Sequence, residues 1–254
     1  MLVAERYEKI VSLVNERGSI RVSELSELCQ VTEETIRRDL DRLERAGRLR
    51  RSHGGAVNVK DSALQPEIPY AVREITNADE KKRIALEAIK RIEPKDRILL
   101  DASSTAWYMA SDVPDITLTV LTNSIKVATE LSIKEKIEVI STGGILAQRS
   151  LSFVGPLAER SLDAYHVDKV FLSCKGVHLE RGISESNELQ ARIKQRMIGM
   201  ADEVILLADS SKIGVQAFTH VADLSEVDTL ITDKRMPQET IERLEDKGIT
   251  VITV

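Results

Sequence analysis

Apolar side chains near the start of the chain recur at the three- and four-residue spacing of amphipathic helices, and this spacing predicts three helices. The first helix ends at Gly18, and a short second helix begins after Ser23. The third begins at the N-cap Thr32 and runs to about Ala46, with acidic residues in its first turn. The inward-facing residues of the three helices are Tyr7, Ile10, Val11 and Val14, then Leu25 and Leu28, then Ile36, Leu40 and Leu43.

Two short strands, Arg48–Ser52 and Ala56–Val59, follow the third helix and flank a glycine-rich turn that permits positive φ. A short β-like step, Ile20–Val22, separates the first two helices. Three helices closed by a β-hairpin predict a winged helix-turn-helix domain over residues 1–59. Residues 60–77 contain two prolines and show little periodicity, which predicts a linker.

From Ala78 onward the pattern changes to continuous apolar strands that alternate with helices. This alternation predicts an α/β domain over residues 78–254, with a mostly parallel sheet covered on both faces. The predicted strands are Ile98–Asp101, Thr117–Leu121, Ile137–Ser141, Lys169–Ser173, Val204–Ala208, Thr229–Thr232 and Val251–Val254.

Composition narrows the class of protein. Charged residues among the first ten argue against a signal peptide, and no apolar run approaches the length of a membrane span. Two cysteines, Cys29 and Cys174, lie far apart in the sequence, and the four histidines lack the spacing of zinc ligands. We therefore expect a cytoplasmic protein with no membrane partner, no metal and no cofactor.

The net charge of −5 hides a basic segment at residues 35–60, which holds eight Lys/Arg against three Asp/Glu. With its apolar stripe buried, the third helix presents Arg37 and Arg38 near its N-terminal half, where base contacts are expected. Arg42 and Arg45 are expected at the DNA backbone. The predicted DNA-binding residues are Thr32, Thr35, Arg37, Arg38, Arg42, Arg45, Arg51 and His53. A solvated charged helix is the alternative, but the order of helices, turn and basic hairpin favours DNA binding.

Three polar loops follow predicted strands, where parallel sheets bind phosphates: Asp101–Thr105, Thr142–Gly144 and Asp209–Gly214. Lys175 follows another strand, and Glu185, Glu188 and Lys194, near or within the predicted helix at 186–200, are candidates to line the cleft. Helix caps, turns and surface ion pairs are the alternative roles for these residues. The predicted effector-binding residues are Asp101, Ser103, Ser104, Thr105, Thr142, Gly143, Gly144, Lys175, Glu188, Asp209 and Lys212.

The chain resembles the DeoR family of bacterial transcriptional regulators. In the N-terminal domain the resemblance is carried by Val31–Leu40, Leu43, Gly47 and Arg51–Ala56. In the sensor domain it is carried by Asp101–Thr105, Thr122–Ser124, Gly143–Gly144, Gly155, Lys175–Gly176, Gly182–Glu185 and Asp209–Lys212.

The resemblance implies a sensor with the fold of ribose-5-phosphate isomerase and glucosamine-6-phosphate deaminase. It also implies a phosphorylated sugar or sugar-like effector that weakens binding to operator DNA, so that the protein acts as a repressor of a sugar-catabolic operon. In that family Arg37, Arg38 and Asp39 belong to the recognition-helix signature, and we expect Asp39 to orient neighbouring arginines rather than contact DNA.

Two other functions compete with this prediction. A sugar-phosphate isomerase or deaminase with a fused DNA-binding domain could use Asp101, Glu188 or Asp209 as a general base, but no further catalytic constellation is evident. A nucleotide-binding protein is disfavoured because both glycine-rich phosphate-loop motifs are missing from the sequence. Helix-turn-helix proteins usually bind repeated half-sites, which favours a homo-oligomer, either a dimer or a tetramer.

Overall fold

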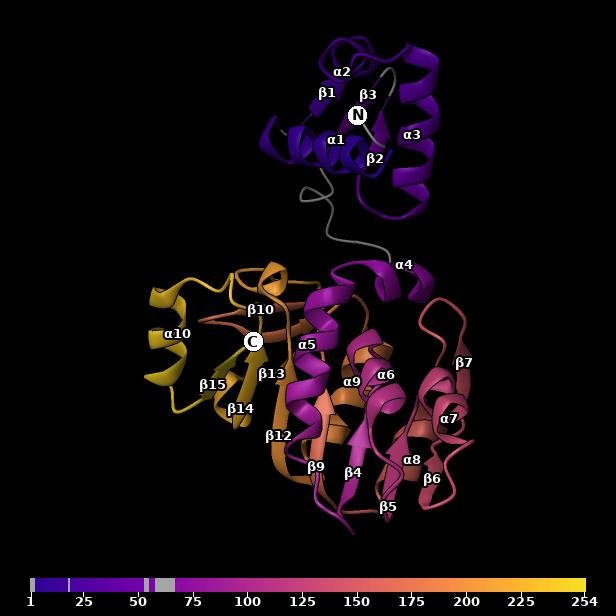
Figure 1. The fold of residues 1–254 in the computed structure, drawn as a ribbon, viewed down its shortest axis with the longest axis vertical. Coiled ribbons are helices and arrows are strands. Elements are labelled where there is room, and N and C mark those ends of the chain that lie inside the picture. The colour runs from indigo at the N-terminus through magenta and orange to yellow at the C-terminus, as the bar shows by residue number, and fades with distance from the viewer. Residues whose placement is uncertain (1–2, 18, 53–54, 58–66) are drawn as a thin grey trace. The chain divides into compact units, whose positions relative to one another are not determined.

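The computed structural model describes residues 3–17, 19–52, 55–57 and 67–254. Residue contacts divide the chain into two units, Met1–Ile68 and Pro69–Val254, and each unit is described by itself (Figure 1). The second unit includes part of the segment predicted as a linker, because Tyr70–Ile75 form a helix. Residues 69–77 of the predicted linker therefore belong to the second unit.

The first unit has the predicted order of three helices and a small sheet. Its elements are α1 (Val3–Arg17), β1 (Ser19–Arg21), α2 (Val22–Cys29), α3 (Glu33–Arg45), β2 (Arg50–Ser52) and β3 (Gly55–Val57). The three strands pair antiparallel in the order β1-β3-β2. The prediction of a winged helix-turn-helix is thus confirmed, and the β-like step after α1 is the third strand of its sheet.

The core of the first unit consists of the predicted helical stripes. Ile10, Val14, Leu25, Ile36 and Leu40 are fully buried, whereas the side chains of Tyr7, Val11 and Leu28 are only partly buried against them. The Thr32 hydroxyl accepts a hydrogen bond from the backbone N–H of Thr35 at 3.3 Å and so caps α3, as predicted.

Gly55 is required for a different reason from the one expected. It does not adopt positive φ, but a Cβ at this position would lie 2.2 Å from the Ile20 carbonyl oxygen. Glycine is needed here because β3 passes directly against β1. The neighbouring residues His53 and Gly54 lie outside the described part of the chain.

The second unit alternates helices and strands, with two small antiparallel additions. Its elements are α4 (Tyr70–Ile75), α5 (Ala78–Ile89), β4 (Arg97–Leu100), α6 (Ser104–Asp112), β5 (Leu118–Thr122), α7 (Ile125–Leu131), β6 (Ile137–Ser141), β7 (Ile145–Ala147), β8 (Ser152–Val154), α8 (Pro156–Leu162), β9 (Val167–Leu172), β10 (Gly176–His178), β11 (Gly182–Glu185), α9 (Glu188–Ile198), β12 (Ala201–Leu207), η2 (Ser210–Lys212), β13 (Thr219–Ala222), η3 (Leu224–Glu226), β14 (Thr229–Thr232), α10 (Gln238–Glu245) and β15 (Thr250–Thr253).

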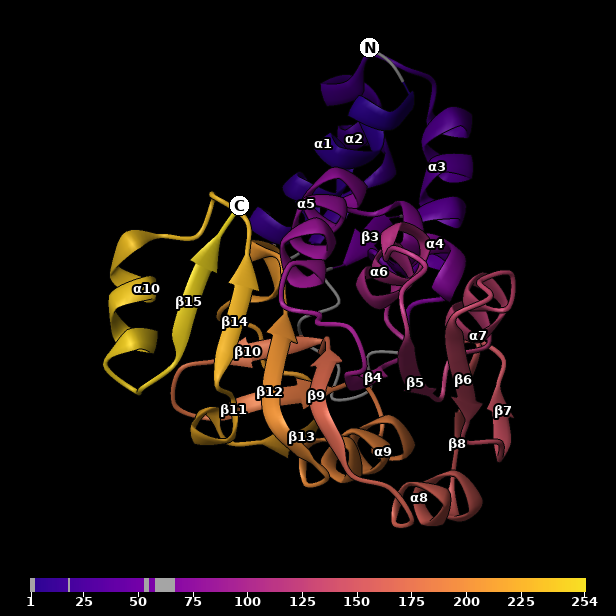
Figure 2. The ribbon, with the colours of Figure 1, turned by 60° about the horizontal axis from the view of Figure 1, so that its bottom comes forward.

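Seven parallel strands form the main sheet in the order β15-β14-β12-β9-β4-β5-β6. α10 lies beside β15 at one edge of this sheet, and the β7–β8 hairpin lies near β6 at the other (Figure 2). The predicted parallel sheet is confirmed. The short strands of the β10-β11-β13 sheet and of the β7–β8 hairpin were not predicted, because three or four residues carry too little periodicity to identify.

Both faces of the main sheet are buried. Along β4, Leu99 belongs to one apolar cluster while Ile98 and Leu100 belong to another, as the two-residue period of a strand requires. Helices α5, α6 and α7 contribute to the cluster of Ile98, and α8, α9 and α10 contribute to that of Leu99. In the sheet β4 lies beside β9, although two strands of the same sheet, β5 and β6, come between them along the chain. The carboxyl ends of these two strands therefore form the topological switch point where α/β sheets bind ligands.

Candidate functional site

Helix α3 presents Arg37 and Arg38 to solvent on the part of its surface that is not covered by its buried apolar residues. Their side chains are 48% and 73% exposed. Arg37 lies 2.6 Å from the Glu33 carboxylate, and Arg38 lies 3.3 Å from that of Glu34. Both pairs are exposed i, i+4 contacts, which bind weakly in water and leave the guanidinium groups available to an anionic partner.

The other predicted DNA-binding residues are distributed over α3 and the wing, which is formed by the paired strands β2 and β3. Thr32 and Arg45 are exposed, and Thr35 is half-buried. Arg42 donates a hydrogen bond to the Tyr7 hydroxyl at 3.2 Å. Arg51 of β2 pairs with Asp41 of α3 at 2.5 Å, so the wing and the recognition helix are joined by a side-chain contact.

Asp39 has a different partner from the one the sequence suggested. This carboxylate is buried, and it accepts hydrogen bonds from Arg6 Nε at 2.6 Å and Arg6 Nη2 at 3.3 Å. The hydrogen bond with Asp39 raises the pKa of Arg6 above its usual value, against the opposing effect of burial. The expectation that Asp39 orients its neighbours Arg37 and Arg38 is therefore corrected: Asp39 joins α3 to α1.

The carboxylate of Asp101 organises the switch point of the second unit. It follows β4, is fully buried and accepts hydrogen bonds from the backbone N–H groups of Ser103 at 3.0 Å and Ser173 at 2.9 Å. The Lys194 ammonium lies 3.1 Å from its second oxygen. Because these contacts occupy both oxygens, Asp101 connects the β4 and β9 loops and is poorly placed to accept a proton from a substrate.

Lys194 of α9 lies between two buried carboxylates. Its Nζ is 2.7 Å from Glu185 Oε1 and also donates to the Ser173 carbonyl. Burial alone would raise the pKa values of Asp101 and Glu185, but the Lys194 ammonium and the hydrogen bonds to each carboxylate together outweigh it and hold both pKa values below their usual range. The three side chains thus form a fully ionised network that supports the carboxyl edge of the sheet.

Four cations gather beside this network: Arg73, Lys81, Lys175 and Lys212, hereafter the cation cluster. They come from α4, α5, the loop after β9, and η2. Lys212 Nζ donates to Ser173 Oγ at 2.5 Å, and Lys81 Nζ donates to the Arg73 carbonyl at 2.5 Å. Lys81 is only 5% exposed.

The members of the cation cluster repel one another. Burial and the neighbouring Lys212 lower the pKa of Lys81 to about 7, with Asp209 acting in the opposite direction. Burial and Lys212 also lower the pKa of Lys175, and Arg73 contributes to both shifts. Cations that disfavour one another in a partly dehydrated space are suited to an anion with more than one charge.

The predicted hydroxyl loops lie at the same edge, but many of their groups are already engaged. Ser103 Oγ caps α6 by accepting from the Ala106 N–H at 3.0 Å, and Ser104 Oγ donates to the Arg73 carbonyl at 3.2 Å. Thr105 is buried in the first turn of α6. Asp209 accepts hydrogen bonds from the backbone N–H and the hydroxyl of Ser211.

The Thr142–Gly144 loop follows β6. The Thr142 hydroxyl donates to the Gly143 carbonyl at 3.2 Å. A Cβ on Gly144 would lie 2.9 Å from the side chain of Ala158 and from the Val154 carbonyl, so this glycine is needed for packing against α8. Gly143 has φ +61° and open space where its Cβ would be. Of the two, only Gly143 leaves room for a ligand.

Glu188 is not brought to the cation cluster. It lies in the exposed first turn of α9, with its carboxylate 3.6 Å from Arg192. Glu185 instead occupies the position beside Lys194. Sequence reasoning missed Arg73 and Lys81, because each reads as an ordinary charged residue of an amphipathic segment. It also missed Asn123, a buried residue after β5 whose Oδ1 has no hydrogen-bond partner among the described residues.

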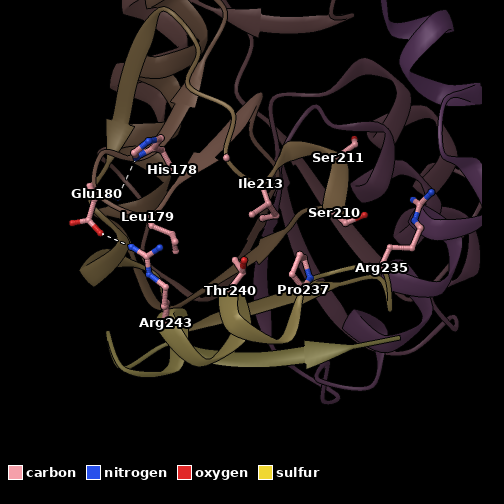
Figure 3. Close-up of a pocket in the computed structure, with 11 residues that line it drawn as sticks. His178, Leu179, Glu180, Ser210, Ser211, Ile213, Arg235, Pro237, Thr240 and Arg243 are labelled. Atoms are coloured by element: carbon pink, nitrogen blue, oxygen red, sulfur yellow. Dashed lines mark hydrogen bonds and ion pairs between the residues drawn. The ribbon is translucent and has the colours of Figure 1, made fainter. Parts of the chain in front are cut away.

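A cavity of about 510 Å³ lies near Ser210 and Ser211 of η2 (Figure 3). Its charged residues are already paired: Arg243 lies 3.2 Å from Glu180, and Arg235 lies 2.8 Å from Asp233. Figure 3 shows the Arg243 guanidinium turned toward Glu180. Because these cations are neutralised, the cation cluster is the better candidate for a phosphate site.

Comparison with known proteins identifies the family. Residues 6–62 match the DeoR-like helix-turn-helix domain, and residues 76–234 match the DeoR C-terminal sensor domain. The chain belongs to the DeoR family of transcriptional regulators, and it is a DNA-binding regulator rather than an enzyme. The expectations of family and fold class are confirmed.

Curated relatives span almost the whole chain. An uncharacterised HTH-type transcriptional regulator, YulB, from Bacillus subtilis (strain 168) is 59% identical over 100% of this chain and 98% of its own length. The L-fucose operon activator of Haemophilus influenzae is 38% identical, with 97% and 98% covered. The HTH-type transcriptional repressor GlcR of Bacillus subtilis is 35% identical, with 99% and 96% covered. Activators and repressors therefore both occur among the relatives.

Among solved structures, ribose 5-phosphate isomerase A from Methanocaldococcus jannaschii overlaps 54% of this chain and 55% of its own, with 20% identity and a TM-score of 0.40. In the described part of the chain, no helix has the length and apolar character needed to cross a membrane.

Proposed function

We propose that this regulator binds operator DNA through α3 and the wing, and that a phosphorylated sugar or sugar-like intermediate bound at the cation cluster releases it. The observation that carries the effector assignment is the convergence of Arg73, Lys81, Lys175 and Lys212 at the switch point of the sheet. A phosphate ester carries up to two negative charges at neutral pH and would relieve the repulsion among these cations.

Hydroxyl groups beside the cation cluster suit the sugar part of such an effector. Ser103, Ser104 and Thr105 lie at the start of α6, and Asn123 offers an unpaired amide oxygen within the same carboxyl edge of the sheet. Relatives named as L-fucose operon activators support a role in sugar metabolism. The proposed effector contacts are Arg73, Lys81, Ser103, Ser104, Thr105, Asn123, Thr142, Gly143, Lys175, Asp209 and Lys212.

For DNA binding, we propose that Thr35, Arg37 and Arg38 contact base edges. The residues proposed to contact the DNA backbone are Thr32, Arg42, Arg45, Arg51 and His53. We propose a homodimer or homotetramer, because helix-turn-helix proteins usually bind repeated half-sites. We also propose that it acts as a repressor in the cytoplasm.

A thermal-shift screen of sugar phosphates, each beside its unphosphorylated parent, tests the effector assignment. We expect one phosphate to raise the unfolding temperature while its parent does not, since binding to the folded state stabilises it. Lys212→Ala should weaken that response by about tenfold or more and leave operator binding intact. Lys90→Ala, which alters the exposed lysine at the C-cap of α5, is the matched control and should respond like the wild type. If no phosphate stabilised the protein, the sugar-phosphate sensor would be wrong while the DNA-binding role would stand.

The sign of regulation is tested separately by placing a reporter behind the operator in cells that lack the protein. Reporter expression that rises when the protein is removed is the expected result for a repressor. Expression that falls would assign an activator, as in the relative named for the L-fucose operon.

A further inference from the structure

Helix α4 is the first element of the second unit, and it reaches the sheet domain through a two-residue connection. Thr76 and Asn77 join α4 to α5, and Asn77 has the left-handed φ of +51°. The Asn77 amide donates to Asp209 Oδ1 at 3.0 Å and to Ser211 Oγ at 3.2 Å, so this turn is attached to the loop that carries Lys212. Figure 1 shows α4 lying across the edge of the sheet toward which the strand arrows point.

The C-terminal carbonyls of α4 are satisfied by side chains of the second unit rather than by helical bonds. The Arg73 carbonyl accepts hydrogen bonds from Lys81 Nζ at 2.5 Å and from Ser104 Oγ at 3.2 Å. The Glu74 carbonyl accepts a third from the Tyr108 hydroxyl at 3.0 Å. The last carbonyls of any helix lack intrahelical partners, which leaves them free to accept such bonds.

Two of these three donors belong to the proposed effector site. An ammonium and a hydroxyl that now face a neutral backbone carbonyl would bind a phosphate oxygen more strongly, because hydrogen bonds to an ionised acceptor are shorter and stronger. The Arg73 guanidinium lies over the Tyr70 ring of the same helix, 5.5 Å from the ring centroid, and its hydrogen bonding is incomplete. Its Nη2 lies 3.5 Å from the Ser150 carbonyl, and its buried Nε has no partner among the described residues.

We propose that the C-terminal turn of α4 occupies, in the effector-free protein, the donors that the effector phosphate takes. Effector binding displaces the backbone of this turn, while the long Arg73 side chain keeps its guanidinium at the phosphate. This inference rests on the proposed effector site at the cation cluster. Since α4 begins at Tyr70, directly after the segment that connects it to the DNA-binding unit, its displacement changes how that unit is tethered. Effector binding and release of α4 are then two sides of one equilibrium.

Linkage gives this device a distinctive signature. A change that weakens the docking of α4 without touching the effector site must tighten effector binding, because less docking has to be undone. The same change must shift the DNA affinity of the effector-free protein toward that of the effector-bound protein. A merely structural role for α4 predicts weaker effector binding or none of these effects.

Tyr108→Phe is the variant that separates these cases. It deletes the hydrogen bond to the Glu74 carbonyl but keeps the aromatic ring, whose centroid lies 4.9 Å from that of Trp107. Tyr165→Phe, at a 43% exposed tyrosine of the same unit, is the matched control. The binding of inorganic phosphate to both full-length variants and to the wild type is measured by calorimetric titration. Hydrogen exchange of the peptide covering residues 69–77 is followed with and without phosphate.

We expect Tyr108→Phe to bind phosphate about two- to tenfold more tightly, the range for one neutral hydrogen bond, and Tyr165→Phe to match the wild type. Phosphate should speed hydrogen exchange in residues 69–77 of the wild type while protecting the cation cluster around Lys81 and Lys212. Unchanged or weaker binding by Tyr108→Phe, or slower exchange in residues 69–77, would overturn the displacement of α4 and leave the effector site in place. If the wild type showed no saturable binding of phosphate, both the displacement of α4 and the proposed effector site would be overturned.

Discussion

The two units of this protein hold their functional cations in opposite ways. On the DNA-binding unit, Arg37 and Arg38 are exposed, and each has an acidic neighbour one turn away on the same helix. On the sensor unit, Lys81 is buried, and its strongest charged neighbour is another lysine, Lys212. Exposed cations bind a polyanion by releasing its counterions, whereas buried cations in excess select a small anion that fits among them.

Each unit also contains a buried ionic contact that supports its functional surface. In the first unit a single arginine, Arg6, meets a single carboxylate, Asp39, and joins α1 to the recognition helix. In the second unit one ammonium, Lys194, meets two carboxylates, Asp101 and Glu185. The second arrangement depends more heavily on one residue, because removing Lys194 would leave two buried carboxylates without the ammonium that they share.

The largest expected effect is that of Lys194→Met on stability. Removing one partner of a buried ionic network leaves uncompensated charge, so the free energy of unfolding should fall by about 3–5 kcal/mol. Urea denaturation of the full chain measures this change. Arg196→Met on the same helix removes an exposed contact with Asp163 and should change stability by about 0.5 kcal/mol or less. Equal losses in the two variants would contradict the contrast between buried and exposed pairs.

Arg38→Ala should have the next largest effect, on the DNA-binding unit alone. Deleting a guanidinium that reads a base edge should reduce discrimination between operator and unrelated DNA about ten- to hundredfold. Competition binding assays with both DNAs measure the ratio, and the response to phosphate should be unchanged. Arg160→Ala, at an exposed arginine of the sensor unit, is the control. A loss of affinity that is equal for both DNAs would show that Arg38 contacts only the backbone.

The smallest expected effect is a pH dependence of anion binding by the sensor unit. The pKa of Lys81 is about 7, so this side chain loses its charge as the pH rises above that value. Sulfate, whose charge is constant in this range, should bind more weakly by up to about tenfold per pH unit between pH 7 and 9. Lys81→Arg keeps its charge throughout and should remove most of this dependence. An equally steep dependence in that variant would assign the titration to another group.

The same lowered pKa has a consequence for stability. The pKa of Lys81 in the folded protein lies below the ordinary value of 10.5, so the unfolded chain binds the proton more tightly. The free energy of unfolding contributed by this group therefore rises as the pH increases from about 7 toward 10.5. Sulfate should reduce that rise, because it stabilises the protonated form of Lys81 in the folded state.

Local periodicity predicted most of the fold. The stripes of α1 and α3 and the apolar strands β4, β9, β12 and β14 were identified from spacing alone, since a helix or a strand repeats its buried positions every few residues. The exposed arginines of α3 followed from the same period, because fixing the buried face of a helix fixes its opposite face. The helix in residues 70–75 was missed because six residues following a proline carry too little repeat.

The sensor site was predicted only in part. Loops after strands could be located from the sequence, and Lys175, Asp209 and Lys212 do lie at the predicted edge. Glu188 was selected in place of Glu185, although the two are only three residues apart, because the choice depends on how the chain turns into α9. Gly144 was predicted to be part of a phosphate-binding loop, but the space beside it is filled by Ala158 of α8.

By itself, the sequence determined the two-part organisation, the winged helix-turn-helix, the parallel sheet and the family. Tertiary structure alone decided which charges meet. Arg6 reaches Asp39 across 33 positions, and Lys194 reaches Asp101 because β4 and β9 are neighbours in the sheet. Helical and strand periods act over a few residues and are written in the local sequence. The convergence of side chains at a site depends on strand order and helix placement, which are set by the packing of the whole unit.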